Sequence, residues 1–227
     1  MSTEESGGER ANGDRVNRQN RGAREEILRR VREAVKKAAP RLDAIATGPL
    51  FSPIPNPLER FQTECAANFM ETILTPDRAG TAAALRQVLA SLPPGEIFLQ
   101  DTPELRQLAP AVQERSVRWS SEGGPAESSQ ATISLCEALV ALTGSVLVSS
   151  MGCGGRGASV VAPCHVVVAH AAQLVLDLEA ALTHARQIAF DNSYVGLITG
   201  SSRTADIEKR LIIGAHGPRR LVVLIEQ

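Results

Sequence analysis

The stretch VGLITGSSRTADIEKRLIIGAHG, residues 195–217, decides the expected fold. Its first part, Val195–Ile198, is short and apolar with a β-branched residue at each end, and Thr199-Gly200 follows it, which predicts a strand buried on both faces and then a tight turn. From Ala205 to Ile212 the apolar residues recur at helical spacing. A strand, a turn and a helix in this order form the unit in which α/β proteins place binding groups at the carboxyl end of a parallel strand.

The polar residues of this turn have two interpretations. Ser202 or Thr204 can accept a hydrogen bond from a free backbone N–H as a helix N-cap. Alternatively, the turn contacts a ligand. Asp206 and Glu208 in the first helical turn suit the helix dipole but oppose a bound phosphate, so Arg203 would have to outweigh both charges. The sequence leaves both interpretations open.

A second informative segment runs through the middle of the chain. Residues 139–142 and 145–148 are predicted to form two strands that meet at the tight turn Thr143-Gly144. The glycine-rich run 152–157 follows, with Arg156 inside it, and then the apolar strand VVAPCHVVV, residues 160–168. Glycines let the backbone approach a ligand closely, and an arginine can pair bidentately with a carboxylate or phosphate. The run matches neither a phosphate-binding loop nor a Rossmann spacing, and a flexible hairpin is the alternative.

Together these segments resemble the lactate-utilisation (LUD) domain family, and in particular its protein C branch. The resemblance rests on TGSSRTADIE followed by LIIGAHGP, and on the order Thr-Gly turn, strand, Gly-Arg-Gly loop and Pro-x-His strand. It covers roughly residues 139–225. Two departures stand out: Leu142 lies where family members usually carry an acidic residue, and Ser201 replaces a usual proline.

The resemblance implies an α/β fold: a three-layer α/β/α domain with a mostly parallel sheet, similar to glucosamine-phosphate deaminases, ribose-phosphate isomerases and CoA transferases. It also implies a component of the L-lactate utilisation system, which oxidises lactate to pyruvate together with iron–sulfur partner proteins. The expected clusters belong to those partners, with no cofactor in this chain. The chain would then be a substrate-handling or assembly subunit, and no catalytic nucleophile is assigned.

The expected ligand is a small carboxylate or phosphate, bound where the two signature segments meet. Lactate is a carboxylate, so Arg156 or Arg203 is the natural partner for its charge. His165 and His216 are the histidines nearest the expected cleft, with structural roles as the alternative. The predicted ligand-binding residues are Thr143, Gly144, Ser145, Gly154, Gly155, Arg156, Gly157, Thr199, Gly200, Ser201, Ser202, Arg203, Thr204, Asp206 and His216.

Composition limits the other function classes. The chain has 227 residues, 43% of them hydrophobic, and a net charge of −1, which suits one sizeable core and gives no basic surface for nucleic acid. Its aromatic content of 3% argues against stacking on single strands. No apolar run reaches the roughly 18–20 residues of a membrane helix, and no secretory h-region begins the chain, so we expect a cytoplasmic protein without a membrane span.

Cysteine spacing gives a further limit. Cysteines 65, 136, 153 and 164 are widely separated and form no Cys-x-x-Cys pair. This spacing argues against an iron–sulfur cluster or a structural zinc site within the chain. Reduced and mostly buried thiols are the expectation.

Domain organisation follows from changes in composition. Residues 1–21 are polar and lack large apolar side chains, which predicts a disordered tail. Residues 22–57 contain an amphipathic helix and a proline-rich connector, and residues 58–227 form the LUD-like α/β domain. The polar run 120–130 is expected to be a surface segment, with a lid as one possibility.

Two other functions stay open at this point. The wider fold allows a stand-alone enzyme that acts on a sugar phosphate or a CoA thioester, although Leu142 removes the obvious carboxylate nucleophile. The second is a non-catalytic scaffold, in which the helix and connector recruit partners. Calorimetric titration with CoA and sugar phosphates tests the former, and deletion of residues 1–57 tests the latter.

Overall fold

A computed structural model describes residues 22–34, 36, 52–123, 128–151, 154–201, 203–204, 212–213 and 217–227. The chain divides into two compact units, Met1–Ser52 and Pro53–Gln227. The division falls inside the proline-rich connector. None of the helices in the described ranges is long and apolar enough to cross a bilayer.

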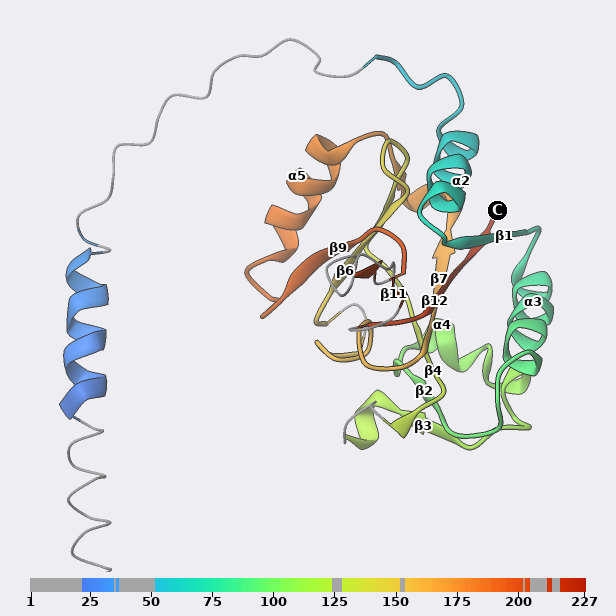
Figure 1. Ribbon diagram of the computed structural model, residues 1–227, viewed down its shortest axis with the longest axis horizontal. Helices are drawn as coiled ribbons and strands as arrows, with labels where there is room; N and C mark the ends of the chain where they lie inside the picture. The colour runs from blue at the N-terminus through green and yellow to red at the C-terminus, as the bar shows by residue number, and fades with distance from the viewer. Residues whose placement is uncertain are drawn as a thin grey trace, which may run out of the picture. The chain divides into compact units, whose positions relative to one another are not determined.

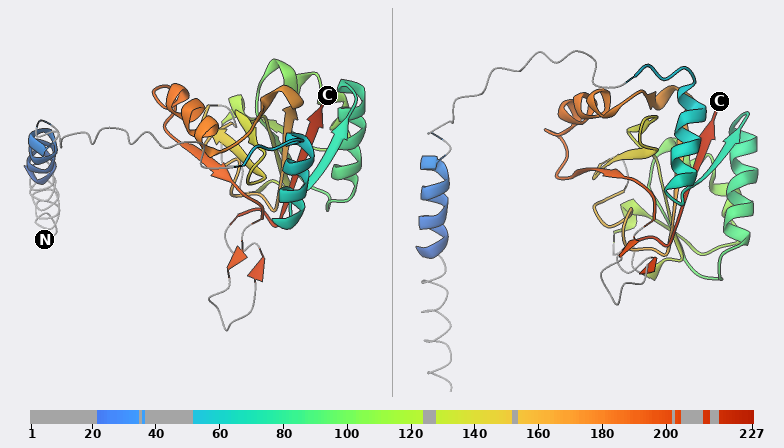
Figure 2. Two further views of the ribbon diagram at one scale, coloured as in Figure 1. Left: turned by 90° about the horizontal axis from the view of Figure 1, so that it is seen from above. Right: turned by 45° about the horizontal axis from the view of Figure 1, so that its top comes forward.

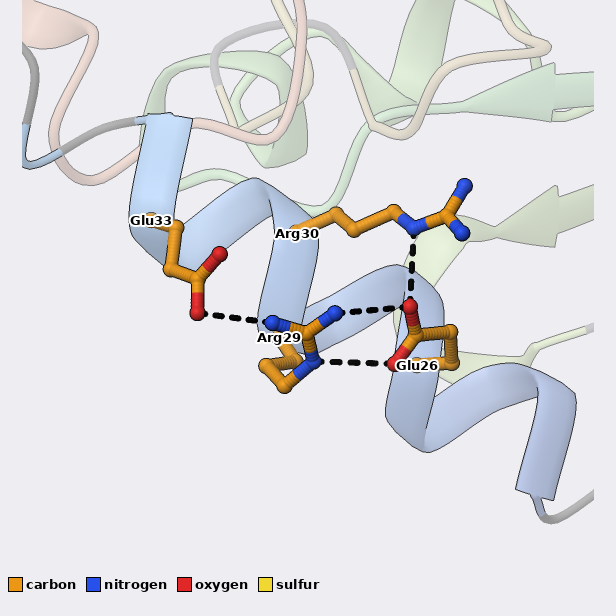
Figure 3. Close-up of polar contacts among 4 residues, drawn as sticks. All are labelled: Glu26, Arg29, Arg30 and Glu33. Atoms are coloured by element: carbon orange, nitrogen blue, oxygen red, sulfur yellow. Dashed lines mark hydrogen bonds and ion pairs between the residues drawn. The ribbon is translucent and has the colours of Figure 1, made fainter.

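The first unit contains a helix over residues 22–34, as its amphipathic pattern predicts. Arg29 bridges Glu26 and Glu33, with each N–O distance at 2.8 Å, and Arg30 also contacts Glu26 (Figure 3). Pairs at this spacing stabilise a helix only weakly, because the solvent screens exposed charges. The two arginines also hold the pKa of the Glu26 carboxyl below its usual range.

The second unit is built around a six-stranded sheet in which all neighbouring strands are parallel (Figure 1). Apolar residues fill the central strands, as expected of a sheet covered on both faces. In spatial order the strands are β1 (Glu71–Thr75), β12 (Arg220–Glu226), β7 (Cys164–His170), β4 (Ala131–Ser134), β2 (Ile97–Leu99) and β3 (Val117–Trp119).

One face of this sheet packs against α3 (Arg78–Ala90) and α4 (Pro103–Arg106). Leu85 and Leu89 of α3 join Val222 and Leu224 of β12 in one buried cluster. Because side chains alternate along a strand, the intervening residues of β12 point to the opposite face.

The opposite face is covered by α2 (Pro57–Ala67) together with a smaller sheet, so that α2 and α3 flank β12 (Figure 2). The smaller sheet has the order β8 (Leu174–Val175), β5 (Ala138–Val140), β6 (Ser145–Ser149) and β9 (Val195–Ile198), and α5 (Leu178–Ile188) contacts β5 and β6. Phe61 of α2 and Val146 of β6 meet Val223 in the second buried cluster. The predicted three-layer α/β fold with a mostly parallel sheet is confirmed, and the hairpin of β5 and β6 lies where its Thr-Gly turn predicts.

The environment predicted for Val195–Ile198 is wrong in two respects. The segment is a strand, but it pairs antiparallel with β6 at the edge of the smaller sheet. Its residues are partly exposed, because an edge strand of an outer layer has less of the chain around it than a strand of the central sheet.

The helix predicted from Ala205 lies mainly outside the described residues, since 205–211 are not among them. The residues just before it and its last predicted residue are described. Arg203–Thr204 (β10) pairs antiparallel with Ile212–Ile213 (β11), so the helical interpretation is wrong at Ile212. β-branched residues favour such extended pairing.

Helix α3 begins at a side-chain cap that gives a direct stability test. Asp77 Oδ1 accepts from the backbone N–H of Gly80 at 2.7 Å. We expect Asp77→Ala to lower the free energy of unfolding by about 1 kcal/mol, because one of the free N–H groups loses its partner. Urea denaturation measures the change, and Asp77→Asn, which keeps an acceptor oxygen, should retain most of the stability.

Candidate functional site

The structure brings together the two Thr-Gly turns singled out in the sequence. Because β6 and β9 are antiparallel, the start of β6 lies beside the end of β9. Ser145 Oγ lies 2.7 Å from Thr143 Oγ1 and 2.6 Å from Thr199 Oγ1. The hydroxyl group of Ser145 therefore links those of Thr143 and Thr199.

Both turns also pack against the carboxyl end of α2. Gly144 has a φ of 63°, and a β-carbon there would lie 2.6 Å from the backbone nitrogen of Cys65. Gly200 has a φ of 81°, and a β-carbon there would overlap the carbonyl oxygen of Asn68. Ser201 Oγ donates to the carbonyl oxygen of Phe69 at 3.1 Å. Close packing therefore accounts for both glycines without a ligand.

The glycine-rich run lies elsewhere, beyond the opposite end of β6. Gly154, Gly155 and Gly157 follow that end, and Arg156 Nε donates to Ser193 Oγ at 3.2 Å. A five-residue strand at roughly 3.3 Å per residue separates the two ends of β6 by about 13 Å. The described chain thus does not gather Arg156 and the hydroxyl cluster into one site.

The remaining predicted residues are described only in part. Ser202, Asp206 and His216 lie outside the described residues. For Arg203 and Thr204 the backbone is described and forms β10.

The glycine-rich run packs at the carboxyl ends of β2 and β4, where the topology of the main sheet reverses. From β2 the chain continues to β3 on one side, and from β4 it continues to β7 on the other. Open α/β sheets bind ligands outside such a switch point. A β-carbon at Gly154 would lie 3.3 Å from the β-carbon of Gln100, the residue that follows β2.

Gln100 connects the strand ends to this run. Its backbone N–H donates to the carbonyl oxygen of Ile133 at 3.0 Å, and its side-chain Oε1 accepts from the backbone N–H of Leu135 at 2.9 Å. Its Nε2 donates to the carbonyl oxygen of Met151 at 3.2 Å, just before the glycines. The amide is buried, so it fixes the approach of the run to the sheet. Sequence reasoning missed Gln100, whose only signal is a polar residue directly after a buried apolar strand.

His165 extends this network into the core. It is fully buried in β7, and its Nε2 lies 2.9 Å from Ser134 Oγ. Ser134 Oγ in turn donates to the carbonyl oxygen of Leu135 at 3.0 Å. Burial lowers the pKa of the His165 imidazole to about 4, so the ring is neutral near pH 7. A chain of contacts therefore runs from His165 through Ser134, Leu135 and Gln100 to Met151.

Two arginines near these strand ends differ in their partners. Arg106 makes two contacts with the Asp101 carboxylate, at 2.6 and 2.8 Å, and lies 4.6 Å from the centre of the Trp119 ring. Arg106 and then the hydroxyl of Ser121 hold the pKa of the Asp101 carboxyl below its usual range. Arg156 is exposed, and in the described part of the chain it forms no ion pair. The charge of Arg156 is therefore not paired with a carboxylate among the described residues.

A hollow between α5 and the smaller sheet contains none of these residues. Its volume is 740 Å³, and Glu137, Asp177, Glu179 and His184 are among the residues that line it. The Glu137 carboxylate accepts from Ser149 Oγ at 2.6 Å. Three carboxylates disfavour a small anion, and the hollow contains none of the predicted ligand-binding residues.

Comparison with known proteins now decides the family. The LUD domain model matches residues 58–225. The chain belongs to the LUD domain family. The predicted family and its protein C branch are thus confirmed.

Curated relatives of this LUD domain chain share the name "Lactate utilization protein C". The relative from Geobacillus thermodenitrificans (strain NG80-2) is 28% identical over 163 residues, which is 63% of this chain and 68% of that protein. The one from Geobacillus kaustophilus (strain HTA426) is 27% identical over 187 residues, 74% and 77% of the two chains. The one from Bacillus subtilis (strain 168) is 25% identical over 183 residues, which is 72% of this chain and 75% of that protein.

A solved structure supports the fold of the LUD domain. The crystal structure of a DUF162 family protein from Deinococcus radiodurans superposes with a TM-score of 0.61 at 17% identity. The match covers 75% of this chain and 96% of that protein.

The described cysteines of the LUD domain lie on separate elements. Cys65 lies in α2, Cys136 follows β4 and Cys164 begins β7, and all three are buried free thiols. Burial raises the pKa of the Cys65 thiol to about 12 and that of Cys164 to about 11. Thiolates are the form that binds metals, so these residues are poor ligands where they lie. Within the described ranges, no group of three or more His, Cys, Asp or Glu side chains is placed to hold a metal ion.

Proposed function

We propose that this chain is a component of an L-lactate utilisation system and binds a small carboxylate at its glycine-rich run. The family match over residues 58–225 and the shared name of the curated relatives support the pathway. The observation that carries the binding site is the location of Arg156, whose charge has no carboxylate partner in the described chain and which lies beside the switch point.

The chemistry of Arg156 matches that of the ligand. A guanidinium group pairs with a carboxylate through two parallel N–H donors, and lactate and pyruvate both carry one carboxylate. Only the Nε of Arg156 has a described hydrogen bond, to Ser193, so its terminal nitrogens remain for a ligand. An inorganic phosphate or a phosphate ester presents similar acceptors, and competition between the two classes distinguishes them.

The residues of the two Thr-Gly turns are assigned a structural role. Ser145 bonds to both Thr143 and Thr199 and so ties the two turns together, and we assign the three residues to shaping the smaller sheet rather than to contacting lactate. Arg203 stays in the proposal as a second source of positive charge, on the stretch that continues from β9.

The electron chemistry is proposed to occur in partner proteins. Oxidation of lactate to pyruvate removes two electrons and two protons, and an acceptor must take the electrons. Buried thiols on separate elements are unsuited to cluster ligation, which supports the placement of iron–sulfur clusters in the partners. The chain itself would handle the substrate or assemble the complex.

Growth on lactate tests the proposed function. In a strain that lacks this protein, we expect the wild-type chain to restore growth on L-lactate and Arg156→Ala to restore it poorly, because the ligand loses its charge partner. Arg203→Ala tests the second arginine. Arg86→Ala is the matched control, since it removes an exposed arginine from α3. Full rescue by both Arg156→Ala and Arg203→Ala would contradict the proposed anion site.

A further inference from the structure

Two neighbouring residues on the second face of the main sheet each carry a buried polar atom that has no hydrogen-bond partner among the described residues. These atoms are Thr132 Oγ1 in β4 and His165 Nδ1 in β7, and both side chains are 0% exposed. Thr132 and His165 are register partners in adjacent parallel strands, so their side chains leave the sheet on the same face. The pair is therefore a local polar site inside an apolar layer.

The contacts of Ser134 determine which atom of His165 carries the proton. A carbonyl oxygen can only accept, so the hydroxyl hydrogen of Ser134 goes to Leu135. Nε2 of His165 must then donate to Ser134 Oγ. In a neutral ring Nδ1 then carries no hydrogen and can only accept a hydrogen bond. None of the described protein groups donates to it, so the donor must be another molecule.

Apolar neighbours limit what can supply that donor. Across the sheet, Phe98 is the register partner of Thr132, and Leu221 is the register partner of His165. Both are buried, which excludes a charged or bulky ligand. A second orphan hydroxyl, that of Ser159, is also buried, and its neighbour Ala158 packs against Phe98.

We propose that one water molecule occupies an internal site between Thr132 and His165. It donates one hydrogen to His165 Nδ1 and accepts the hydroxyl hydrogen of Thr132. Buried waters commonly satisfy polar groups that otherwise have no partner, and leaving such groups unpaired is costly. The water extends the network that runs from His165 through Ser134, Leu135 and Gln100 to Met151, the residue before the glycine-rich run. It thereby holds the imidazole ring of His165 in its orientation.

The test compares two variants of the full chain. Thr132→Val keeps the shape of the side chain and removes the hydroxyl, whereas Thr132→Ser keeps the hydroxyl. We expect Thr132→Val to lower Tm by about 2–8 °C and to shift the ¹⁵N resonance of His165 Nδ1, because the water loses its second partner. Thr132→Ser should leave that resonance near its wild-type position.

A crystal structure at high resolution supplies the second measurement. We expect one solvent peak within hydrogen-bond distance of both Thr132 Oγ1 and His165 Nδ1. The proposal is overturned if Thr132→Val keeps or raises Tm with an unchanged His165 resonance, since removal of a truly orphaned hydroxyl is neutral or stabilising. It is also overturned if the site is empty, or if it holds density larger than a water molecule.

Discussion

Gly200→Ala is expected to lower the free energy of unfolding by about 3–5 kcal/mol, because two separate costs meet at this residue. Its φ of 81° is unfavourable for a residue with a β-carbon. That β-carbon would also overlap the carbonyl oxygen of Asn68, which is backbone at the end of α2 and cannot rotate away. Urea denaturation measures the change.

Gly123→Ala is the matched control for this substitution. Gly123 has a φ of 74°, close to that of Gly200, but a β-carbon there would meet none of the described residues within 4 Å. We expect it to cost about 1–3 kcal/mol, the strain of the backbone alone. Equal losses for the two variants would show that the contact between the second Thr-Gly turn and α2 contributes nothing.

Acid is expected to destabilise the protein through His165. The pKa of its imidazole is about 4 in the folded chain, below the ordinary 6.5. Between these values the unfolded chain binds a proton that the folded chain excludes, so stability falls as the pH falls from about 6.5 to about 4. A shift of this size corresponds to about 3 kcal/mol in total, measured by urea denaturation across that pH range.

A substitution at this site isolates its contribution. His165→Gln cannot titrate, so its stability should change less between pH 6.5 and pH 4 than that of the wild type. His184→Gln is the control, because His184 is a partly exposed histidine on α5. If His165→Gln and the wild type lose stability in parallel over this range, the buried imidazole is not the cause.

Much of the fold follows from local patterns. The continuous apolar runs that form β7 and β12 predict buried strands, and the Thr-Gly turn at Gly144 predicts the β5–β6 hairpin. An apolar run does not specify which strand it pairs with. The sequence of Val195–Ile198 therefore predicts a strand, but it contains nothing that assigns the strand to the antiparallel edge of a second sheet.

The site was less accessible to sequence reasoning for a related reason. A glycine that approaches a ligand and a glycine that approaches another part of the chain satisfy the same steric requirement. Gly144 and Gly200 meet α2, which only the tertiary structure reveals. Gln100 makes its contacts through residues distant in sequence, so no spacing rule points to it. Arg156 stays a prediction as a ligand-binding residue.

Titration of the purified full chain with L-lactate tests the central claim most directly. We expect saturable binding by the wild type and by Arg86→Ala, and at least about tenfold weaker binding by Arg156→Ala, since a charge-assisted hydrogen bond contributes about 1.5–3 kcal/mol. Calorimetry or chemical-shift changes at Gly154 and Gly157 report the binding, with CoA and inorganic phosphate as competitors. Unchanged lactate affinity in Arg156→Ala, or tighter binding of CoA than of lactate, would contradict a small-carboxylate site at the glycine-rich run.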